Sequence, residues 1–478
     1  MNARAVKPGV IIVLGAALSA CLVGPNYHRP AAAAAAQYKE PSGWTAATPQ
    51  DGAPKGNWWT DFHDPLLDEL APLVAVSNQT VRADYANYQE ALAEVRVARA
   101  QLFPSVGITG SASRALASAG SGATGKPLNS ASLEGTVSWT PDLWGQVRRL
   151  IEENAAIAQA DEATLANATL SEQALLATTV IELRMADADI DLQQQTVDAY
   201  REALRVTEVQ GTAGIAATPP SAVITAKVAL ETAEATLVSL GVARAEYAHA
   251  VAVLVGKNPE DLDIPHSAVR PTLPSIPAGV PSTLLERRPD IAAAERTMAA
   301  QNAAIGIAVA AYYPTVPLSA SAGFSQSPLD GLLHAANHVW AIGASGTETI
   351  FDFGERHAEV AAARAAYESA VATYRGTVLN AFENVENDLS GLRILAEQAQ
   401  ALDVAVRDAI RGTQIALAEF QAGTADYTTV AAAQETQLAD QQSALSVEQS
   451  RLVDAVALIG DLGGGWSSDQ LHDPLHSH

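Results

Sequence analysis

Residues 98–108 read ARAQLFPSVGI, and residues 308–318 read AVAAYYPTVPL. Each stretch continues an alanine-rich, helix-like run up to a proline, Pro104 or Pro314. Proline breaks the interior of a helix, and the residues that follow alternate between apolar and small polar types, as in a strand. The sequence therefore predicts the same change from helix to strand twice, 210 residues apart.

Two more landmarks recur in the same order. Pro-Asp-Leu-Trp-Gly at 141–145 returns as Phe-Asp-Phe-Gly at 351–354, and Val-Ala-Val-Leu-Val-Gly at 251–256 returns as Ala-Val-Ala-Leu-Ile-Gly at 455–460. Chance similarity between alanine-rich helices is the alternative, but three landmarks in one order favour a duplication. We predict two copies of a unit that runs helix, strand, turn, strand, long helix, helix.

The strands of each unit have a period of two. They are predicted at about 105–116 and 130–140 in the first repeat, and at about 315–326 and 337–350 in the second. An apolar face opposite a small polar face fits a membrane β-barrel, and it also fits a hairpin on a soluble core. The position of each hairpin between very long helices favours the barrel. The candidates to face lipid are Trp139, Phe324 and Trp340.

Four strands are too few to close a barrel, since single-chain barrels have at least about eight. An open edge in hydrocarbon leaves backbone groups unpaired, so several identical chains are expected to share one barrel. No continuous run of about 18 apolar residues follows residue 21. Strands are therefore the predicted way for this chain to cross a bilayer.

The helices after the hairpins are exceptionally long. The predicted helices run from Asp142 to about Gln210 and from Asp352 to about Gly412; the first, of about 68 residues, makes a rod of about 100 Å. Apolar residues recur every seven positions in the second helix, which is typical of a left-handed coiled coil. Its two seams are Val371, Val378, Val385 and Leu392, and Tyr367, Tyr374 and Ala381. The chain turns back at Gly-containing segments, which lie at the ends of the rods farthest from the strands.

The N-terminus reads as an export signal. Arg4 and Lys7 precede an apolar run, and Leu18-Ser19-Ala20-Cys21 resembles the bacterial lipobox. That resemblance implies that Cys21 becomes the lipid-modified N-terminus, with palmitate-type acyl chains. A buried small side chain is the alternative for a lone cysteine. The resemblance to sorted lipoproteins also implies the outer membrane, because residue 22 is leucine rather than aspartate.

Composition excludes several classes of protein. The chain has 478 residues, of which 48% are hydrophobic, and a single cysteine, so it is neither disordered nor a disulfide-stapled module. A net charge of −24 argues against a nucleic-acid ligand. The sequence has no Walker loop, HExxH, Cys/His metal cluster or Gly-x-Ser-x-Gly elbow, so we predict neither an enzyme, nor a cofactor, nor a metal site.

Taken together, the chain resembles the TolC-like outer-membrane factors, in particular the lipoprotein (NodT-type) branch that serves resistance–nodulation–division efflux pumps. The residues that carry the resemblance are Cys21 with Gly24-Pro25-Asn26-Tyr27; Trp58-Trp59 with Phe62, Asp64 and Pro65; Phe103-Pro104; Leu284-Leu285 with Arg288-Pro289-Asp290-Ile291; Phe351-Asp352-Phe353-Gly354; and Leu462-Gly463-Gly464-Gly465-Trp466.

The resemblance implies a mainly helical homotrimer. Three chains of four strands form a twelve-stranded barrel in the outer membrane, continued by a helical tunnel across the periplasm. A periplasmic adaptor meets the helix tips and connects to an inner-membrane pump. The protein is then a passive conduit for drugs, toxic compounds or metal ions, and its one covalent group is the lipid on Cys21.

The resemblance also places a gate at the helix tips. The family commonly closes its tunnel with leucine and aspartate rings, and here Thr428 and Ala432 stand at those positions. The resemblance therefore does not fix the charge of the gate. Asp426 is either a nearby acidic ring or an ordinary turn residue. The full set of gate and adaptor-tip candidates is Gly214, Gly423, Asp426, Tyr427, Thr428 and Ala432.

Other motif residues read as structural. Pro289 suits the first turn of a helix, and the charge of Asp290 there meets the helix dipole. Besides these two, the structural set comprises Pro104, Arg288, Pro314, Gly354 and Trp466. His472, His476 and His478 read as part of a flexible end rather than a metal site.

The predicted organisation is a signal peptide over 1–20, a lipid-anchored segment over 21–60, a first repeat over 61–260, a linker over 261–282, a second repeat over 283–466 and a flexible tail over 467–478. Two rival functions stay open. One is a conduit of the same fold for type I protein secretion. The other is a lipid-anchored periplasmic coiled-coil spacer without a pore.

Overall fold

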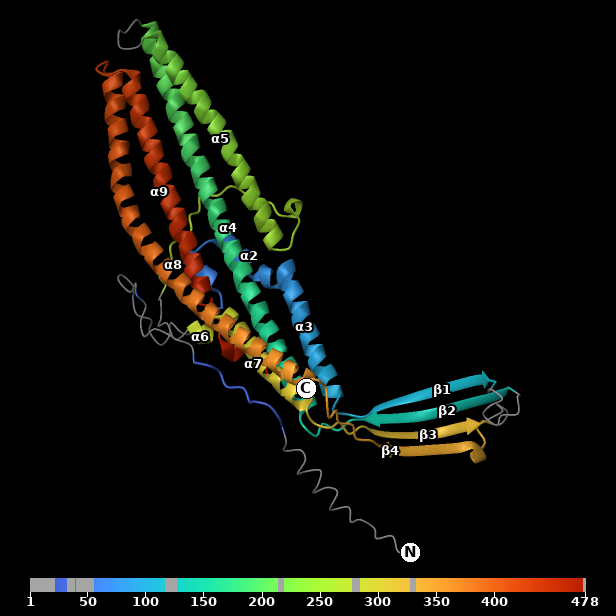
Figure 1. The fold of residues 1–478 in the computed structure, drawn as a ribbon. Coiled ribbons are helices and arrows are strands. Elements are labelled where there is room, and N and C mark those ends of the chain that lie inside the picture. Colours follow the sequence, from blue (N-terminus) through green and yellow to red (C-terminus); the bar gives the residue numbers. More distant parts are fainter. Residues whose placement is uncertain are drawn as a thin grey trace.

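A computed structural model describes residues 22–31, 39, 56–116, 127–213, 219–276, 284–326 and 332–475. The predicted lipidation site, Cys21, and the tip residue Gly214 lie outside these ranges. Long helices form an elongated bundle, and a four-stranded sheet extends from one of its ends (Figure 1). The turns at the other end are the helix tips, farthest from the strands.

The first repeat begins with a short 3₁₀ helix and ends with a helical hairpin. Its elements are η1 (Trp58–Phe62), α2 (Pro65–Ser77), α3 (Gln79–Ala100), β1 (Ser105–Ala115), β2 (Leu128–Trp139), α4 (Gln146–Thr212) and α5 (Pro220–Leu254).

The short helix η3 (Pro259–Asp261) lies between the first repeat and the linker, and the second repeat follows. Its elements are α6 (Leu284–Arg287), α7 (Pro289–Ala310), β3 (Leu318–Gln326), η5 (Ala335–Asn337), β4 (His338–Ala344), α8 (Glu355–Gln421), α9 (Tyr427–Asp461) and η6 (Ser468–Gln470). Equivalent helices have equal lengths: α3 and α7 have 22 residues, α4 and α8 have 67, and α5 and α9 have 35. The predicted duplication and fold class are confirmed.

The predicted helix before Pro104 is two helices, α2 and α3. Asn78 ends α2 in extended backbone, and its side chain accepts hydrogen bonds from the amides of Thr80 and Val81, capping α3. Its amide group also donates to the carbonyl of Leu254 at 2.9 Å. A capping residue without Gly or Pro therefore makes the break, which hydrophobic periodicity did not reveal.

The sheet has the order β1-β2-β3-β4, and all its pairings are antiparallel. Its register separates two faces, because paired residues share a face. Residues at even positions of β1, β3 and β4 and odd positions of β2 form one face, which is apolar along most of its length. They include Val106, Ile108, Leu133, Val137, Trp139, Leu318, Phe324, Trp340 and Ile342. Serine, threonine and glycine dominate the other face.

The two strands of the second repeat are shorter than predicted at the end nearest the helices. β3 begins at Leu318 rather than about 315, and β4 ends at Ala344 rather than about 350. An isolated bridge between Thr315 and Thr347 continues the same register. In the single chain β1 and β4 are the two edges of the sheet, so residues 345–350 have a neighbour on one side only.

The long helices pack side by side. α4 contacts α5, α7 and α9, and α8 contacts α7 and α9. On α8 the predicted coiled-coil seams lie at least partly inside: Tyr374, Val378 and Val385 are fully buried, and Val371 is half-buried. The main core lies where α2, α4, α5 and α9 meet and includes Leu67, Leu176, Ile181, Val251 and Leu458.

Among the described residues, one helix, α5, is long and apolar enough to cross a membrane by length and composition alone, and its most apolar window is only 17% buried. It contains charged and polar residues, so it is not a continuous apolar run. The part of the tail over 467–475 is docked rather than free. Arg99 of α3 donates to the carbonyl of Pro474 at 2.6 Å, and the amide of His472 donates to Glu162 of α4 at 2.9 Å.

Candidate functional site at the helix tips and the strand junction

The second helical hairpin turns at its tip through Gly423. This residue has φ +73, a left-handed conformation that glycine adopts without strain, and no atom would lie within 4 Å of an added Cβ. Its amide donates to the carbonyl of Phe420, and the amide of Thr424 donates to the carbonyl of Glu419. These two bonds close the end of α8 in the manner of a helix C-cap.

Asp426 starts the returning helix. Its carboxylate accepts hydrogen bonds from the amide of Thr429 at 3.2 Å and from the hydroxyls of Thr428 at 2.6 Å and Thr429 at 3.0 Å. The hydroxyl of Thr428 is the main cause that holds the pKa of Asp426 below its usual range. Asp426 is therefore ionised at neutral pH and acts as the N-cap of α9.

A small apolar cluster supports the tip from inside. Phe420 and Tyr427 are fully buried and meet edge to face, with ring centroids 5.9 Å apart. Ala222 and Ala226 of α5 and Val430 complete much of the cluster. The hydroxyl of Tyr427 is buried without a hydrogen-bond partner, and burial raises its pKa to about 12.

The remaining tip candidates lie on the surface of the single chain. Gly423, Thr428 and Ala432 are exposed, whereas Tyr427 is buried in the cluster. The structure therefore brings Asp426 and Thr428 into direct contact, and it leaves Ala432 one helical turn further along α9.

The strand junction, where the hairpins meet the helices, differs between the repeats. In the first repeat Trp144 stacks on Tyr313, with centroids 4.9 Å apart, and its indole donates to the carbonyl of Pro314 at 2.8 Å. In the second repeat the corresponding Phe353 is 91% exposed, and Phe103, which corresponds to Tyr313, is 69% exposed.

The segment after the predicted lipid site is held at this junction. Arg149 of α4 is only 1% exposed, and it donates to the carbonyls of Val23 and Gly24 and to the side chain of Asn26 at 2.9 Å. An added Cβ on Gly24 would lie 2.5 Å from Cα of Gly306, so the two backbones touch. The start of the described chain is thus fixed against both repeats.

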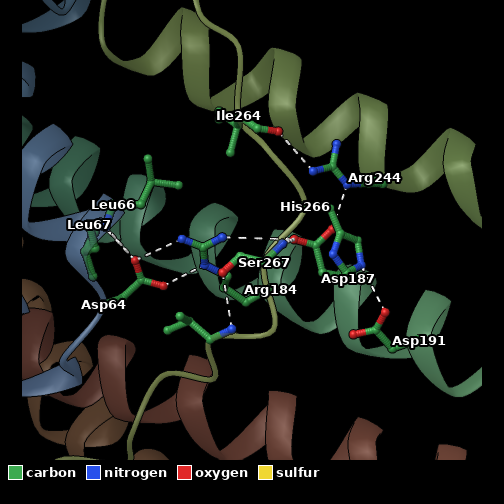
Figure 2. Close-up of polar contacts among 11 residues, drawn as sticks. Asp64, Leu66, Leu67, Arg184, Asp187, Asp191, Arg244, Ile264, His266 and Ser267 are labelled. Carbon is green, nitrogen blue, oxygen red and sulfur yellow. Dashed lines mark hydrogen bonds and ion pairs between the residues drawn. The ribbon is translucent and has the colours of Figure 1, made fainter.

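Buried charges cross-link the middle of the rods, and we call Asp64, Arg184, Asp187 and Arg244 the waist network (Figure 2). Nε of Arg184 lies 2.8 Å from Asp64, which also caps α2. Asp187 pairs with Nε of Arg244 at 2.6 Å and accepts from the amide of Ser267 at 3.1 Å. The network therefore holds α2, α4, α5 and the linker together.

A second charged group joins α7, α8 and α9. Arg288 contacts Asp290 and Asp461, each at 2.7 Å. Burial, followed by the charge of Asp461, raises the pKa of Asp388 to about 8. Oδ2 of Asp388 is buried, and the charged groups near this carboxyl are the carboxylates of Asp461 and Asp454 and the guanidinium of Arg288. Arg288, Pro289 and Asp290 thus lie at a helix start, where the structural interpretation put them.

The other motif residues also lie at element boundaries. Pro104 and Pro314 follow α3 and α7, and Gly354 is the N-cap of α8. The amide of Trp466 donates to the carbonyl of Gly463 just after α9. Trp139, Phe324 and Trp340 share the apolar face of the sheet.

Sequence reasoning missed three groups. The waist network draws on residues scattered from 64 to 267, and Arg149 finds its partners 123–126 positions earlier. No local spacing reveals such pairs. The contrast between Trp144 and Phe353 was within reach, because the repeat aligns them, but only the structure shows which one is covered.

Comparisons with known proteins give a consistent result. A family model described as "Outer membrane efflux protein" matches residues 70–257 and 280–464. The toluene efflux pump outer membrane protein TtgF of Pseudomonas putida is 30% identical over 474 residues, 96% of each chain. The outer membrane protein OprJ of Pseudomonas aeruginosa is 28% identical over 475 residues, 95% of each chain. The outer-membrane channel OprN has a TM-score of 0.86 at 29% identity, over 93% of this chain and 100% of that one.

Proposed function

The chain belongs to the outer membrane efflux protein family, and from this premise we propose that three copies form the outer-membrane channel of a tripartite efflux system. It is a passive conduit rather than an enzyme. The helix tips meet a periplasmic adaptor, and an inner-membrane resistance–nodulation–division pump supplies the energy and selects the cargo.

The two-faced sheet is the observation that carries this proposal. One face of the four strands is apolar along most of its length and includes Trp139, Phe324 and Trp340, while serine and threonine line the other. In a barrel the first face meets lipid and the second meets water. Polar residues on the apolar face lie only at the loop ends of the two hairpins in the described strands: Arg114, Asn129, Gln326 and His338.

Small organic molecules are the proposed cargo. The relatives named above include an efflux pump component for toluene, and they match this chain over nearly its full length. The net charge of −24 gives a channel built from three copies a negative field, which favours cations over anions in transit.

Lipid on Cys21 is the proposed anchor. The segment from Val23 to Asn26 is fixed by Arg149 beside the strand junction, so an acylated Cys21 lies two residues before a buried contact. This contact supports an anchor at the strand junction. The anchor and the barrel then hold the same end of the molecule.

Native mass spectrometry of protein extracted from outer membranes tests the assembly and the anchor together. We expect the mass of three chains, each lacking residues 1–20 and carrying acyl groups on Cys21. A Cys21→Ser variant is the matched control and should lose the acyl mass. A monomer without lipid would contradict both the channel and the anchor, and it would favour another role for the helical rods.

The proposed gate is the ring of helix tips around Gly214 and Gly423. Opening spreads these tips, because they hold few packed residues beyond the cluster of Phe420 and Tyr427. The test is a Thr212→Cys/Thr424→Cys pair at the two tips of one chain. Oxidation should block efflux and reduction should restore it, whereas either single variant should transport normally. Unchanged efflux by the fully cross-linked protein would contradict a gate at the tips.

A further inference from the structure

The two repeats end their hairpins differently, and this asymmetry points to a contact between copies of the chain. Trp144 stacks on Tyr313 of the other repeat, whereas Phe353, whose ring contacts only Phe351 of its own turn, and Phe103 are both exposed among the described residues. The same landmarks align Phe353 with Trp144 and Phe103 with Tyr313. The chain therefore also carries the counterparts of the two stacked rings, and both counterparts lie exposed at its outer edges.

The strand register shows that the two hairpins are equivalent. Ala112 of β1 pairs with Ala131 of β2. Ala322 of β3 lies 210 positions after Ala112, and Trp340 of β4 lies 209 positions after Ala131. These two residues also pair. The offset of 210 carries β1 onto β3, and the offset of 209 carries β2 onto β4.

The seam inside the chain is the pairing of β2 with β3, and it serves as a template for a seam between copies. Within the chain Gly135 pairs with Ala322. Adding 209 to the position of Gly135 on β2 gives Ala344 on β4. Subtracting 210 from the position of Ala322 on β3 gives Ala112 on β1. These two residues lie on the outer strands of one sheet, so they can pair only between different copies.

We propose that β4 of one copy pairs with β1 of the next in the register that sets Ala344 opposite Ala112, and that Phe353 stacks on Phe103 of that next copy. The inference rests on the trimeric channel proposed above and specifies its subunit seam. The phenylalanine pair takes the place of the Trp144–Tyr313 pair and makes a purely apolar contact.

The two faces of the sheet test this register independently. In the proposed pairing even positions of β4 meet even positions of β1, so Trp340 meets Leu116 and the apolar face continues across the seam. A slip of one residue would set Trp340 beside the polar face of the next copy. Residues 345–350 would then gain the second neighbour that they lack in the single chain, with Thr347 opposite Thr109.

The helices support the same seam. Inside the chain α4 contacts α7 and α9. The equivalent contacts between copies join α8 to α3 and α5 of the next copy. The helices on both sides of this seam carry exposed apolar side chains. On a surface that faces water, such side chains mark interfaces. They are Leu379, Ile394, Val404 and Ile415 on α8, Ile224, Val228, Val238 and Val242 on α5, and Tyr85 and Val97 on α3.

Disulfide trapping in native outer membranes tests the register. The Ala112→Cys/Ala344→Cys variant should give covalent dimers and trimers on oxidation. The matched control, Gly135→Cys/Ala322→Cys, has the same local geometry and should cross-link within one chain. A shifted pair, Ala112→Cys/Ile342→Cys, should not cross-link, because diagonal neighbours lie about 7–8 Å apart.

Each result decides a different point. A ladder from the shifted pair, or a trimer by native mass with no ladder from Ala112→Cys/Ala344→Cys, would overturn the proposed register and leave the channel intact. The absence of any trimer would overturn the channel and the seam together. Both readings require the Gly135→Cys/Ala322→Cys control to form its intramolecular disulfide.

A mutant cycle tests the aromatic pair. Phe353→Ala and Phe103→Ala should each lower the temperature at which the trimer dissociates in detergent, and the double variant should lower it little further than either single one. Phe353→Trp with Phe103→Tyr, which recreates the Trp144–Tyr313 pair, should retain the wild-type temperature. Leu333→Ala, an exposed residue in the β3–β4 loop, serves as the control. Additive losses, or none, would overturn the stack.

Discussion

The waist network and the helix tips hold their charged residues in opposite ways. Asp64 and Asp187 at the waist are fully buried and paired with arginines, whereas Asp426 at the tip is exposed and bonded only within its own turn. Breaking a buried pair leaves an uncompensated charge, while moving a surface cap exposes nothing new. The comparison teaches that buried ion pairs cross-link the rods at mid-length, and we expect the rods to move more easily at their ends.

The largest expected effect comes from breaking the waist. Arg184→Ala leaves Asp64 buried without its cation, and we expect a loss of about 3–5 kcal/mol in the free energy of unfolding. Thermal unfolding in detergent measures it. Arg205→Ala on the same helix removes an exposed pair with Glu202 and should leave the melting temperature unchanged. Equal losses of stability in the two variants would contradict a larger contribution from the buried ion pair than from the exposed one.

The second effect depends on pH and concerns the joint between α8 and α9. The pKa of Asp388 is raised to about 8 in the folded chain, above an unfolded value near 4. The folded state therefore binds more protons between these values, and stability falls as pH rises from about 4 to about 8. The Asp388→Asn side chain stays neutral at every pH. The melting temperature of this variant minus that of the wild type should therefore increase as pH rises from 5 to 8.

The control for this prediction is Asp408→Asn, which changes an exposed carboxyl on the same helix. Its melting temperature should follow the wild type at both pH values. A constant difference between Asp388→Asn and the wild type from pH 5 to pH 8 would contradict a protonated Asp388.

A smaller and local effect is expected at the tip. Asp426→Ala removes the acceptor of the Thr429 amide, so amide hydrogens in the first turn of α9 should exchange faster. Asp426→Asn keeps an acceptor and should preserve most of the protection. Exchange at the waist should be identical in both variants, and a change there would show that tip and waist are coupled rather than independent.

The smallest effect is expected from Tyr427→Phe. The hydroxyl of Tyr427 is buried without a partner, so its removal should leave stability unchanged or slightly higher. Melting temperature and tip exchange measure the result. A clear loss of stability would indicate that the assembled protein supplies a partner for this hydroxyl.

Much of the fold was predictable, because repetition and periodicity are local signals. The proline landmarks at 104 and 314 located both strand pairs, and the seven-residue spacing on α8 located a buried seam. The break at Asn78 and the end of β4 at Ala344 were not predictable. The first depends on a side-chain cap, and the second lies on an edge strand, which has a neighbour on one side only in the single chain.

The site was predictable only in part. The Gly423 turn and the Asp426 cap follow from residue types near a helix end, so their positions could be inferred from the sequence. The waist network could not, since Arg184 is 120 positions from Asp64 and depends on how α2 packs against α4.

Conductance of the purified assembly in a planar lipid bilayer tests the central claim most directly. With the Thr212→Cys/Thr424→Cys pair reduced, we predict discrete channel openings, and oxidation should suppress them reversibly. A lipidated trimer that inserts into the bilayer and never conducts would contradict the conduit and favour a spacer without a pore.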